Sequence, residues 1–206
     1  PLGDAFPPID LRLATTRGTN ALLEGKGAAT VLLVTRGFAD LLLIGDQRRP
    51  DLFSLSQNLP SPIPVSTIEV EGRLDAAGHP LSPLSLSQES RRRLSDLVSQ
   101  GGRHAAVALR HSYRNPTHEK ELEEILQTLG FDHVSLSSEL APLIKILPRT
   151  ESAVVDSTLT PVLGEFLDQV QSSGADLKVM TSSGSLLPRR AFRPKDSLFS
   201  GPAGGV

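Results

Sequence analysis

Residues 15–20 and the following positions gather side chains that could hold a ligand. This segment reads Thr-Thr-Arg-Gly-Thr-Asn, so that hydroxyl and amide groups surround one glycine. It falls at a predicted strand-to-helix junction, where the hydroxyls and the free N–H groups of a helix start could together bind an anion. The alternative is an ordinary capped helix, because Ser, Thr and Asn are common capping residues. The candidate binding residues are Thr15, Thr16, Gly18, Thr19 and Asn20.

A second candidate segment is residues 110–116, Arg-His-Ser-Tyr-Arg-Asn-Pro, which follows a predicted strand. It contains a histidine, two arginines and the only tyrosine of the chain. Ligand sites of open α/β sheets collect at the carboxyl ends of strands. We therefore take His111 and Arg114 as candidate substrate- or phosphate-binding residues. A purely structural loop remains the alternative.

Two further patterns carry less chemistry. His104, His111 and His118 are evenly spaced, but they fall on a predicted strand, loop and helix, so we predict no metal site. The Gly-rich end predicts a backbone turn, which by itself is weak evidence of a binding site. The chain has no Walker A pattern, and Ser182-Ser-Gly-Ser185 does not match a nucleophile elbow.

The elements that must position these residues read as a layered α/β protein. The opening, with a strand at 11–14, a helix at 20–24 and a strand at 29–35, predicts a βαβ-like unit. Alternation over 65–74 predicts a half-exposed strand, and a turn at 75–78 predicts that it returns as a hairpin. The other expected elements are a helix at 87–100, a strand–helix–strand unit over 104–137, a helix at 150–171 interrupted at Pro161, and a strand at 177–181.

Composition limits the function classes. Aromatic residues make up 4% of the 206 residues, so the core must be built from Leu, Val, Ile and Ala, as is usual in α/β layers. The net charge of −2 with interspersed signs gives no electrostatic basis for binding nucleic acid or an anionic membrane. The absence of cysteine excludes disulfides and thiolate sites and fits a cytoplasmic location.

Taken in order, several segments resemble the hydantoinase A / 5-oxoprolinase family. Residues 15–27 resemble its pattern Gly-Thr-Thr-x-Ala-Thr-Asn-Ala-Leu-Leu-Glu-Arg-Lys-Gly, and residues 111–119 resemble its His-Ser-Tyr-x-Asn-Pro-x-His-Glu. Further matching segments are 34–40, 44–53, 73–78, 137–139, 149–150 and 200–206. The chain departs from the pattern at Ala14 and Gly18, where the family has Gly and Ala, and at 182–185, where no acid can be assigned.

The resemblance implies an α/β fold with a mixed sheet and helices packed on it, part of an actin-like (ribonuclease H-like) ATPase architecture. It implies an enzyme that uses ATP and Mg²⁺ to phosphorylate the oxygen of a cyclic amide, such as 5-oxoproline or a hydantoin, before water opens the ring. The alternatives are an ATP-dependent ketone carboxylase of the acetone or acetophenone type and a non-catalytic packing module. Expected partners are the rest of its own chain and a hydantoinase B-type subunit or domain.

The resemblance also predicts domain boundaries and sites. Residues 1–10 are expected to be an extended lead-in, 11–199 the N-terminal region of the family, and 200–206 the start of the next domain. Two Asp-x-Gly-Gly-Thr phosphate motifs are expected outside the chain, so the fragment alone should bind no cofactor and be inactive. The expected nucleotide-cleft turn comprises Ser200, Gly201, Gly204 and Gly205, while the catalytic residues stay unassigned.

Overall fold

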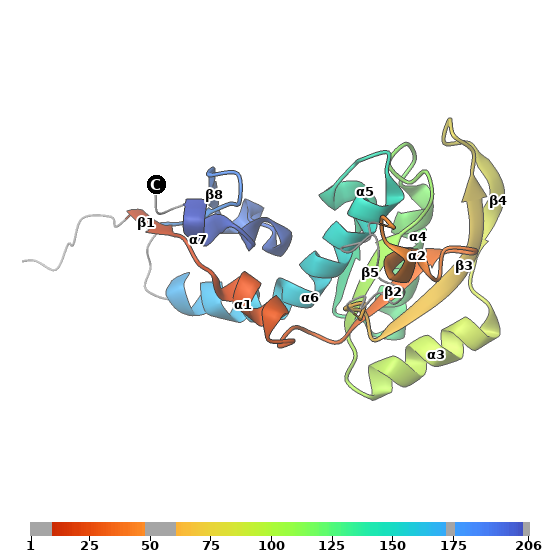
Figure 1. Cartoon of the computed structure of the whole chain (residues 1–206). Helices are drawn as coiled ribbons and strands as arrows, with labels where there is room; N and C mark the ends of the chain where they lie inside the picture. Colours follow the sequence, from red (N-terminus) through yellow and green to blue (C-terminus); the bar gives the residue numbers. More distant parts are fainter. Residues whose placement is uncertain (1–9, 48–60, 172–175, 204–206) are drawn as a thin grey trace, which may run out of the picture. The chain divides into compact units, whose positions relative to one another are not determined.

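The computed structural model describes residues 10–47, 61–171 and 176–203, which divide between two compact units. Unit 1 combines the start of the chain, up to Ala28, with its end from Leu159, and unit 2 comprises Ala29–Thr158. The two units are described separately, and Figure 1 gives the element labels used for both.

Unit 2 is built on a five-stranded mixed sheet with the strand order β4-β3-β2-β5-β6. All neighbouring pairs are parallel except β3 and β4, which form an antiparallel hairpin. The strands are β2 (Thr30–Thr35), β3 (Ser66–Leu74), β4 (Pro80–Ser85), β5 (His104–Ala108) and β6 (His133–Leu136). The hairpin and the parallel strand–helix–strand unit over β5, α4 and β6 confirm the sequence-based prediction.

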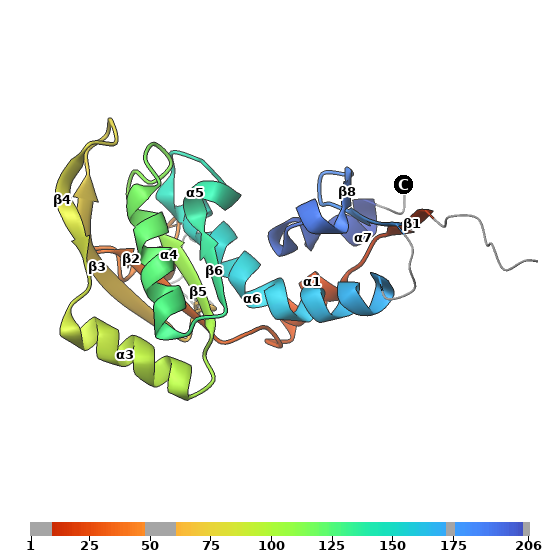
Figure 2. The same cartoon turned by 180° about the vertical axis from the view of Figure 1, so that it is seen from behind.

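Helices cover both faces of this sheet, as the front and back views show (Figures 1 and 2). Val31 and Leu33 of β2 point into one hydrophobic cluster, together with residues of α3 (Gln88–Ser99) and α4 (Thr117–Leu129). Leu32 and Val34 point into a second cluster on the opposite face, which residues of α6 (Ile146–Gln171) join. The short helices of unit 2 are α2 (Leu41–Ile44) and α5 (Ser137–Leu140). Because both faces of β2 are covered, its apolar residues run without alternation.

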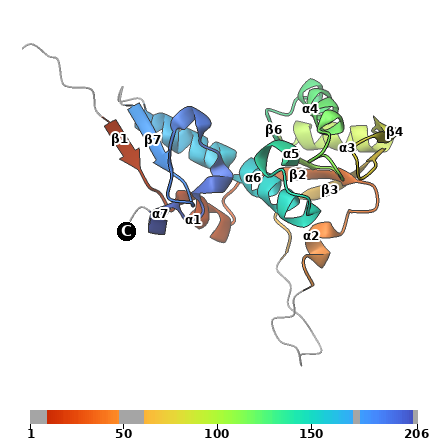
Figure 3. The same cartoon turned by 90° about the horizontal axis from the view of Figure 1, so that it is seen from above.

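Unit 1 holds a smaller sheet of order β1-β7-β8, of which β1 and β7 are labelled in Figure 3. β1 (Asp10–Leu13) pairs in parallel with β7 (Asp176–Met180), and β7 pairs antiparallel with β8 (Leu186–Pro188). The helical elements here are α1 (Arg17–Leu23), the 3₁₀ turns η1 (Arg189–Ala191) and η2 (Pro194–Ser197), α7 (Ser200–Ala203), and the second half of α6.

Two predictions about the elements are wrong. The βαβ-like opening does not form, because β1 pairs with β7 while β2 lies between β3 and β5 in the other sheet. α6 is also not interrupted, since Pro161 lies inside a continuous helix. The proline removes one backbone donor, but burial of Val154 before it and of Leu163 and Leu167 after it stabilises the helix on both sides.

Capping residues set two helix ends of unit 2. Ser87 caps α3 by accepting a hydrogen bond from the backbone N–H of Ser90, and Gly130 ends α4 in the left-handed conformation.

Among the described residues, no helix combines the length and the apolar character needed to cross a membrane.

Candidate functional site

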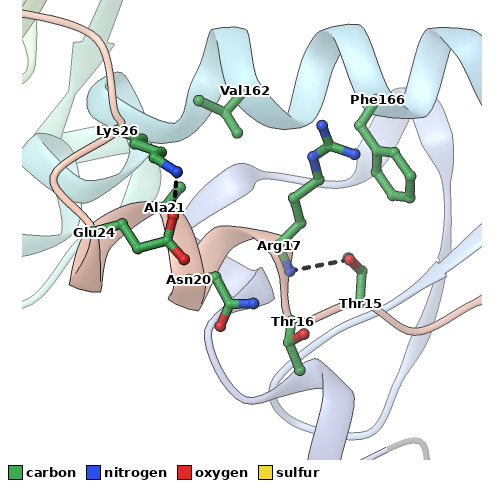
Figure 4. A pocket seen from close by; sticks show the side chains of 9 residues that line it. All are labelled: Thr15, Thr16, Arg17, Asn20, Ala21, Glu24, Lys26, Val162 and Phe166. Carbon is green, nitrogen blue, oxygen red and sulfur yellow. Dashed lines mark hydrogen bonds and ion pairs between the residues drawn. The ribbon is translucent and has the colours of Figure 1, made fainter.

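A pocket of about 470 Å³ opens in unit 1 between α1 and the second half of α6 (Figure 4). α1 and its flanking residues supply hydroxyl, amide and charged groups, while Val162 and Phe166 of α6 form an apolar wall. The lining residues are Thr15, Thr16, Arg17, Asn20, Ala21, Glu24, Lys26, Val162 and Phe166. A pocket with an apolar wall and a few polar groups is the usual form of a small-molecule site.

Some polar side chains of residues 15–20 are hydrogen-bonded within the protein, and others are not. The Thr15 hydroxyl accepts a hydrogen bond from the backbone N–H of Arg17 at 3.1 Å, and the Thr19 hydroxyl donates to the carbonyl of Leu198 at 2.5 Å. Thr16 occupies the N-cap position but makes no side-chain cap bond. Within the described part of the chain, the side chains of Thr16 and Asn20 form no hydrogen bond, so two polar groups of the pocket remain available to a ligand.

The helix start itself contributes less than the sequence suggested. α1 has only seven residues, too short for its N–H groups to make an anion site by themselves. Gly18 is not among the residues that line the pocket. Instead it is buried, and a Cβ there would lie 2.3 Å from the hydroxyl oxygen of Ser197.

The Gly-rich end, predicted as a turn, begins instead as the short helix α7, and the structure brings it against the 15–20 segment within unit 1. The Ser200 hydroxyl donates to the carbonyl of Thr15 at 2.8 Å, and a Cβ on Gly201 would lie 2.4 Å from the methyl carbon of Thr16. Two of the four segments singled out in the sequence therefore pack together. Gly204 and Gly205 lie outside the described residues.

Among the charged residues that line the pocket, one cation is paired with a carboxylate and the other lies over an aromatic ring. The ammonium of Lys26 pairs with the carboxylate of Glu24 at 2.7 Å. The guanidinium carbon of Arg17 lies 4.8 Å from the centre of the Phe166 ring, within cation–π distance. Sequence reasoning had not selected Arg17, although it sits between Thr16 and Gly18 in the chosen segment.

The second candidate segment lies in unit 2, directly after β5. His111 has a φ of 63°, a left-handed conformation that is uncommon outside glycine. Its ring centre lies 6.2 Å from that of Tyr113. Burial, and next the charge of Arg110, lower the pKa of His111 below its ordinary value. Arg114 is exposed on the same loop.

A buried ion pair under this loop was missed in the sequence. Glu119 and Arg149 are fully buried, with 3.7 Å between the carboxylate and the guanidinium. Glu119 accepts from the backbone N–H of Leu109 at 2.9 Å, and Arg149 donates to the carbonyl of Leu109 at 2.8 Å. Both polar backbone groups of the residue that begins the loop are thereby fixed.

The same ion pair gathers hydroxyls from two other segments. Arg149 donates to the hydroxyls of Ser112 and Ser137, and Glu119 also accepts from the hydroxyl and the backbone N–H of Ser138. Residues 111–119, 137–139 and 149–150 had been noted as separate patterns. Glu119 and Arg149 are charged residues of two of these segments, but the separation of the segments in the sequence gives no sign that they meet.

The β3–β4 hairpin also reaches this loop. The side-chain amide of Asn115 donates to the carbonyl of Gly78 at 2.9 Å. On the hairpin turn, Asp75 accepts from the backbone N–H groups of Ala77 and His79 and pairs with the His79 ring at 3.1 Å. Loop 110–116 is therefore held by the buried ion pair through Ser112 and by the hairpin through Asn115.

The three evenly spaced histidines do not form a cluster. His104 lies beside His133, with 6.0 Å between ring centres, and His118 is buried in α4. Burial, followed by the nearby charge of His133, lowers the pKa of His104. No group of three or more His, Asp or Glu side chains placed to hold a metal ion occurs within residues 10–47, 61–171 and 176–203.

Comparison with known protein families gives two adjacent matches. The model described as the hydantoinase/oxoprolinase N-terminal region matches residues 8–130, and the model described as hydantoinase/oxoprolinase matches residues 149–206. The boundary expected at residues 199–200 stays a prediction.

Individual relatives point the same way. 5-oxoprolinase 1 of Arabidopsis thaliana is 39% identical over 229 residues, a match that covers 95% of this chain and 17% of that protein. The acetophenone carboxylase gamma subunit of Aromatoleum aromaticum is 31% identical over 206 residues, covering 88% and 28% respectively. The crystal structure of an ATP-dependent caprolactamase from Pseudomonas jessenii superposes with a TM-score of 0.74 at 27% identity, covering 94% of this chain and 30% of that one. The chain thus spans less than a third of each of these proteins.

Proposed function

Because the chain belongs to the hydantoinase/oxoprolinase family, we propose that it works within an ATP-dependent enzyme that opens cyclic amides through a phosphorylated amide intermediate. The α/β fold with mixed sheets agrees with the actin-like ATPase architecture expected for such an enzyme. Since its relatives are several times longer, we propose that the active form is a longer polypeptide containing this chain. That polypeptide is called the full-length enzyme below.

The pocket of unit 1 is the observation that carries this proposal. It is lined by residues of the segment that resembles the family pattern, and it leaves the hydroxyl of Thr16 and the amide of Asn20 available. A cyclic amide presents one carbonyl acceptor, one N–H donor and an apolar ring edge. The hydroxyl and the amide match the first two, and Val162 and Phe166 match the third.

The chemistry requires activation because an amide oxygen is a poor leaving group. Transfer of a phosphoryl group from ATP to that oxygen makes it a good one, and the protein contributes positioning and charge stabilisation. We propose that Ser200 and Gly201, at the start of α7, lie near the nucleotide. Mg²⁺ is expected to arrive with ATP. The described donor set offers no cluster of ligands for it, so we assign no metal ligand in this chain.

The decisive experiment is Thr16→Val in the full-length enzyme. The Thr16 hydroxyl has no partner among the described residues, so its loss should leave the melting temperature nearly unchanged while turnover of 5-oxoproline or a hydantoin falls about 10-fold or more. Thr19→Val is the matched control, because its hydroxyl is bonded to Leu198 and its loss should lower stability by about 1 kcal/mol. Wild-type turnover in Thr16→Val would reduce the segment to a structural role.

A ketone carboxylase is the second candidate function, favoured by the similarity to the acetophenone carboxylase gamma subunit. A strict requirement for bicarbonate and a carboxylated product would identify it, whereas a ring-opened product without bicarbonate identifies the hydrolase. Failure of the full-length enzyme to bind any nucleotide would instead support a packing module.

The cellular setting is also a proposal. Charge and the cysteine-free composition support a cytoplasmic enzyme that binds neither nucleic acid nor membrane. A hydantoinase B-type subunit or domain is the proposed partner, and co-purification would test it.

A further inference from the structure

We propose that Arg17 selects cyclic amides that carry a carboxylate, by pairing its guanidinium with that carboxylate in the pocket of unit 1. The inference rests on the proposed function and narrows it to one substrate class. It assigns a specificity-determining role to a residue for which the sequence suggested none.

Within the described part of the chain, Arg17 is a cation without a counter-ion. Among the residues that the structure describes, its guanidinium forms no ion pair and no hydrogen bond, although it lines the pocket and carries five N–H donors. Its backbone N–H is bonded to Thr15, which fixes the position from which the side chain extends. Figure 4 shows the side chain reaching from α1 toward α6.

Contact with the Phe166 ring restrains the conformation of the Arg17 side chain. The guanidinium carbon lies 4.8 Å from the ring centre, and the interaction with the ring restrains an otherwise flexible side chain. A cation held in this way loses less conformational entropy when it binds a ligand. Its N–H groups can then donate in pairs to the two oxygens of a carboxylate, the geometry that arginine favours.

The charge of the lining fits a singly charged ligand. Arg17 and Lys26 supply two positive charges and Glu24 one negative charge, so the lining carries a net charge of +1. The Glu24 carboxylate would repel a triphosphate, and Lys26 is already paired with it at 2.7 Å. A carboxylate on a small ring matches both the net charge and the apolar wall, whereas a polyphosphate matches neither.

The test compares two lactams in the full-length enzyme with ATP. 5-Oxoproline carries a carboxylate, and 2-pyrrolidinone is the same five-membered ring without it. Arg17→Gln should lower kcat/KM for 5-oxoproline on the order of 10- to 100-fold, the effect of losing a hydrogen-bonded charge pair, and change kcat/KM for 2-pyrrolidinone by less than about threefold. Arg17→Lys should recover part of the loss, because it keeps the charge but not the paired donors.

Arg190→Gln, an exposed arginine outside the pocket, serves as the control and should change neither substrate. Equal losses for both lactams would overturn the proposal, as would unchanged kinetics or a rise confined to the KM for ATP, which would indicate a phosphate contact. If the wild-type enzyme opens a hydantoin but neither lactam, the carboxylate proposal fails and the proposed function stands. If it opens no cyclic amide at all, the proposed function itself fails.

Discussion

The contact between Gly18 and Ser197 makes a sharp prediction for the packing beside the pocket. A methyl group added at Gly18 would lie 2.3 Å from the Ser197 hydroxyl oxygen and 3.4 Å from a Leu159 methyl carbon. Ser197 is fully buried, and its hydroxyl donates to the carbonyl of Pro194 at 2.7 Å. The hydroxyl can therefore move aside only by breaking this bond.

The expected change in the free energy of unfolding for Gly18→Ala is the sum of three contributions. Overpacking costs about 1–3 kcal/mol and the lost hydrogen bond about 1 kcal/mol, while alanine in place of glycine within a helix returns about 1 kcal/mol. Gly18→Ala should therefore destabilise the protein by about 2 kcal/mol. For a chain of this length that corresponds to a fall in Tm of about 4–8 °C.

A double-mutant cycle with thermal and urea unfolding checks the reasoning. Ser197→Ala removes the obstructing oxygen, and its own Cβ lies 3.4 Å from the added methyl. The double variant should therefore be more stable than the sum of the single effects predicts, by about 1–2 kcal/mol. Gly164→Ala is the matched control, because a Cβ there meets nothing within 4 Å and should stabilise α6 by about 1 kcal/mol. Strictly additive single effects, or a Gly18→Ala variant as stable as the wild type, would refute the argument.

Four other predictions concern unit 2 and the chain as a whole. Arg149→Met should cost about 3–5 kcal/mol in urea unfolding, because it leaves Glu119 buried without its partner, and a cost under about 1 kcal/mol would contradict the described network. His111→Gly should keep or raise Tm by relieving the left-handed backbone, yet lower turnover of the full-length enzyme about 10-fold or more if the ring binds the substrate; full activity would make the loop structural. Burial holds the pKa of His104 below its ordinary 6.5, so as pH falls the unfolded chain takes up this proton first, and the stability present above pH 6.5 should decline until the folded pKa is passed. His104→Gln should flatten that decline in urea titrations between pH 7.5 and 5. An identical decline in the variant would exclude His104 as its source. Finally, the 206-residue chain alone should show no micromolar ATP binding in calorimetry, since the expected phosphate motifs lie outside it, and a clear isotherm would contradict this.

Local patterns were enough to predict most elements. The alternation over residues 65–74 places Ile68 and Val70 on the buried face, as observed, and Ser87 and Gly130 mark helix ends through their own side chain or lack of one. These signals depend on neighbours within a few residues, which is why a single sequence carries them.

Contacts between distant segments could not be predicted in this way. β1 pairs with β7 across the whole of unit 2 in the sequence, and nothing in the four residues of β1 specifies that partner over β2. The approach of Ser200 to Thr15 and the meeting of Glu119 with Arg149 are equally remote. The candidate binding segment was therefore chosen from its composition, whereas the availability of Thr16 and Arg17, as opposed to Thr19, needed the structure.

The Glu119–Arg149 pair has a consequence for how this edge of unit 2 can diversify. Neither residue can be exchanged singly without leaving a buried charge, and both also form hydrogen bonds with Leu109 and Ser137, so the backbone around Leu109 is fixed against gradual change. The exposed side chains that this backbone carries, such as Arg110 and Arg114, bear no such constraint. Single substitutions at these exposed positions can therefore alter the surface of the loop while the buried pair that supports its backbone is kept.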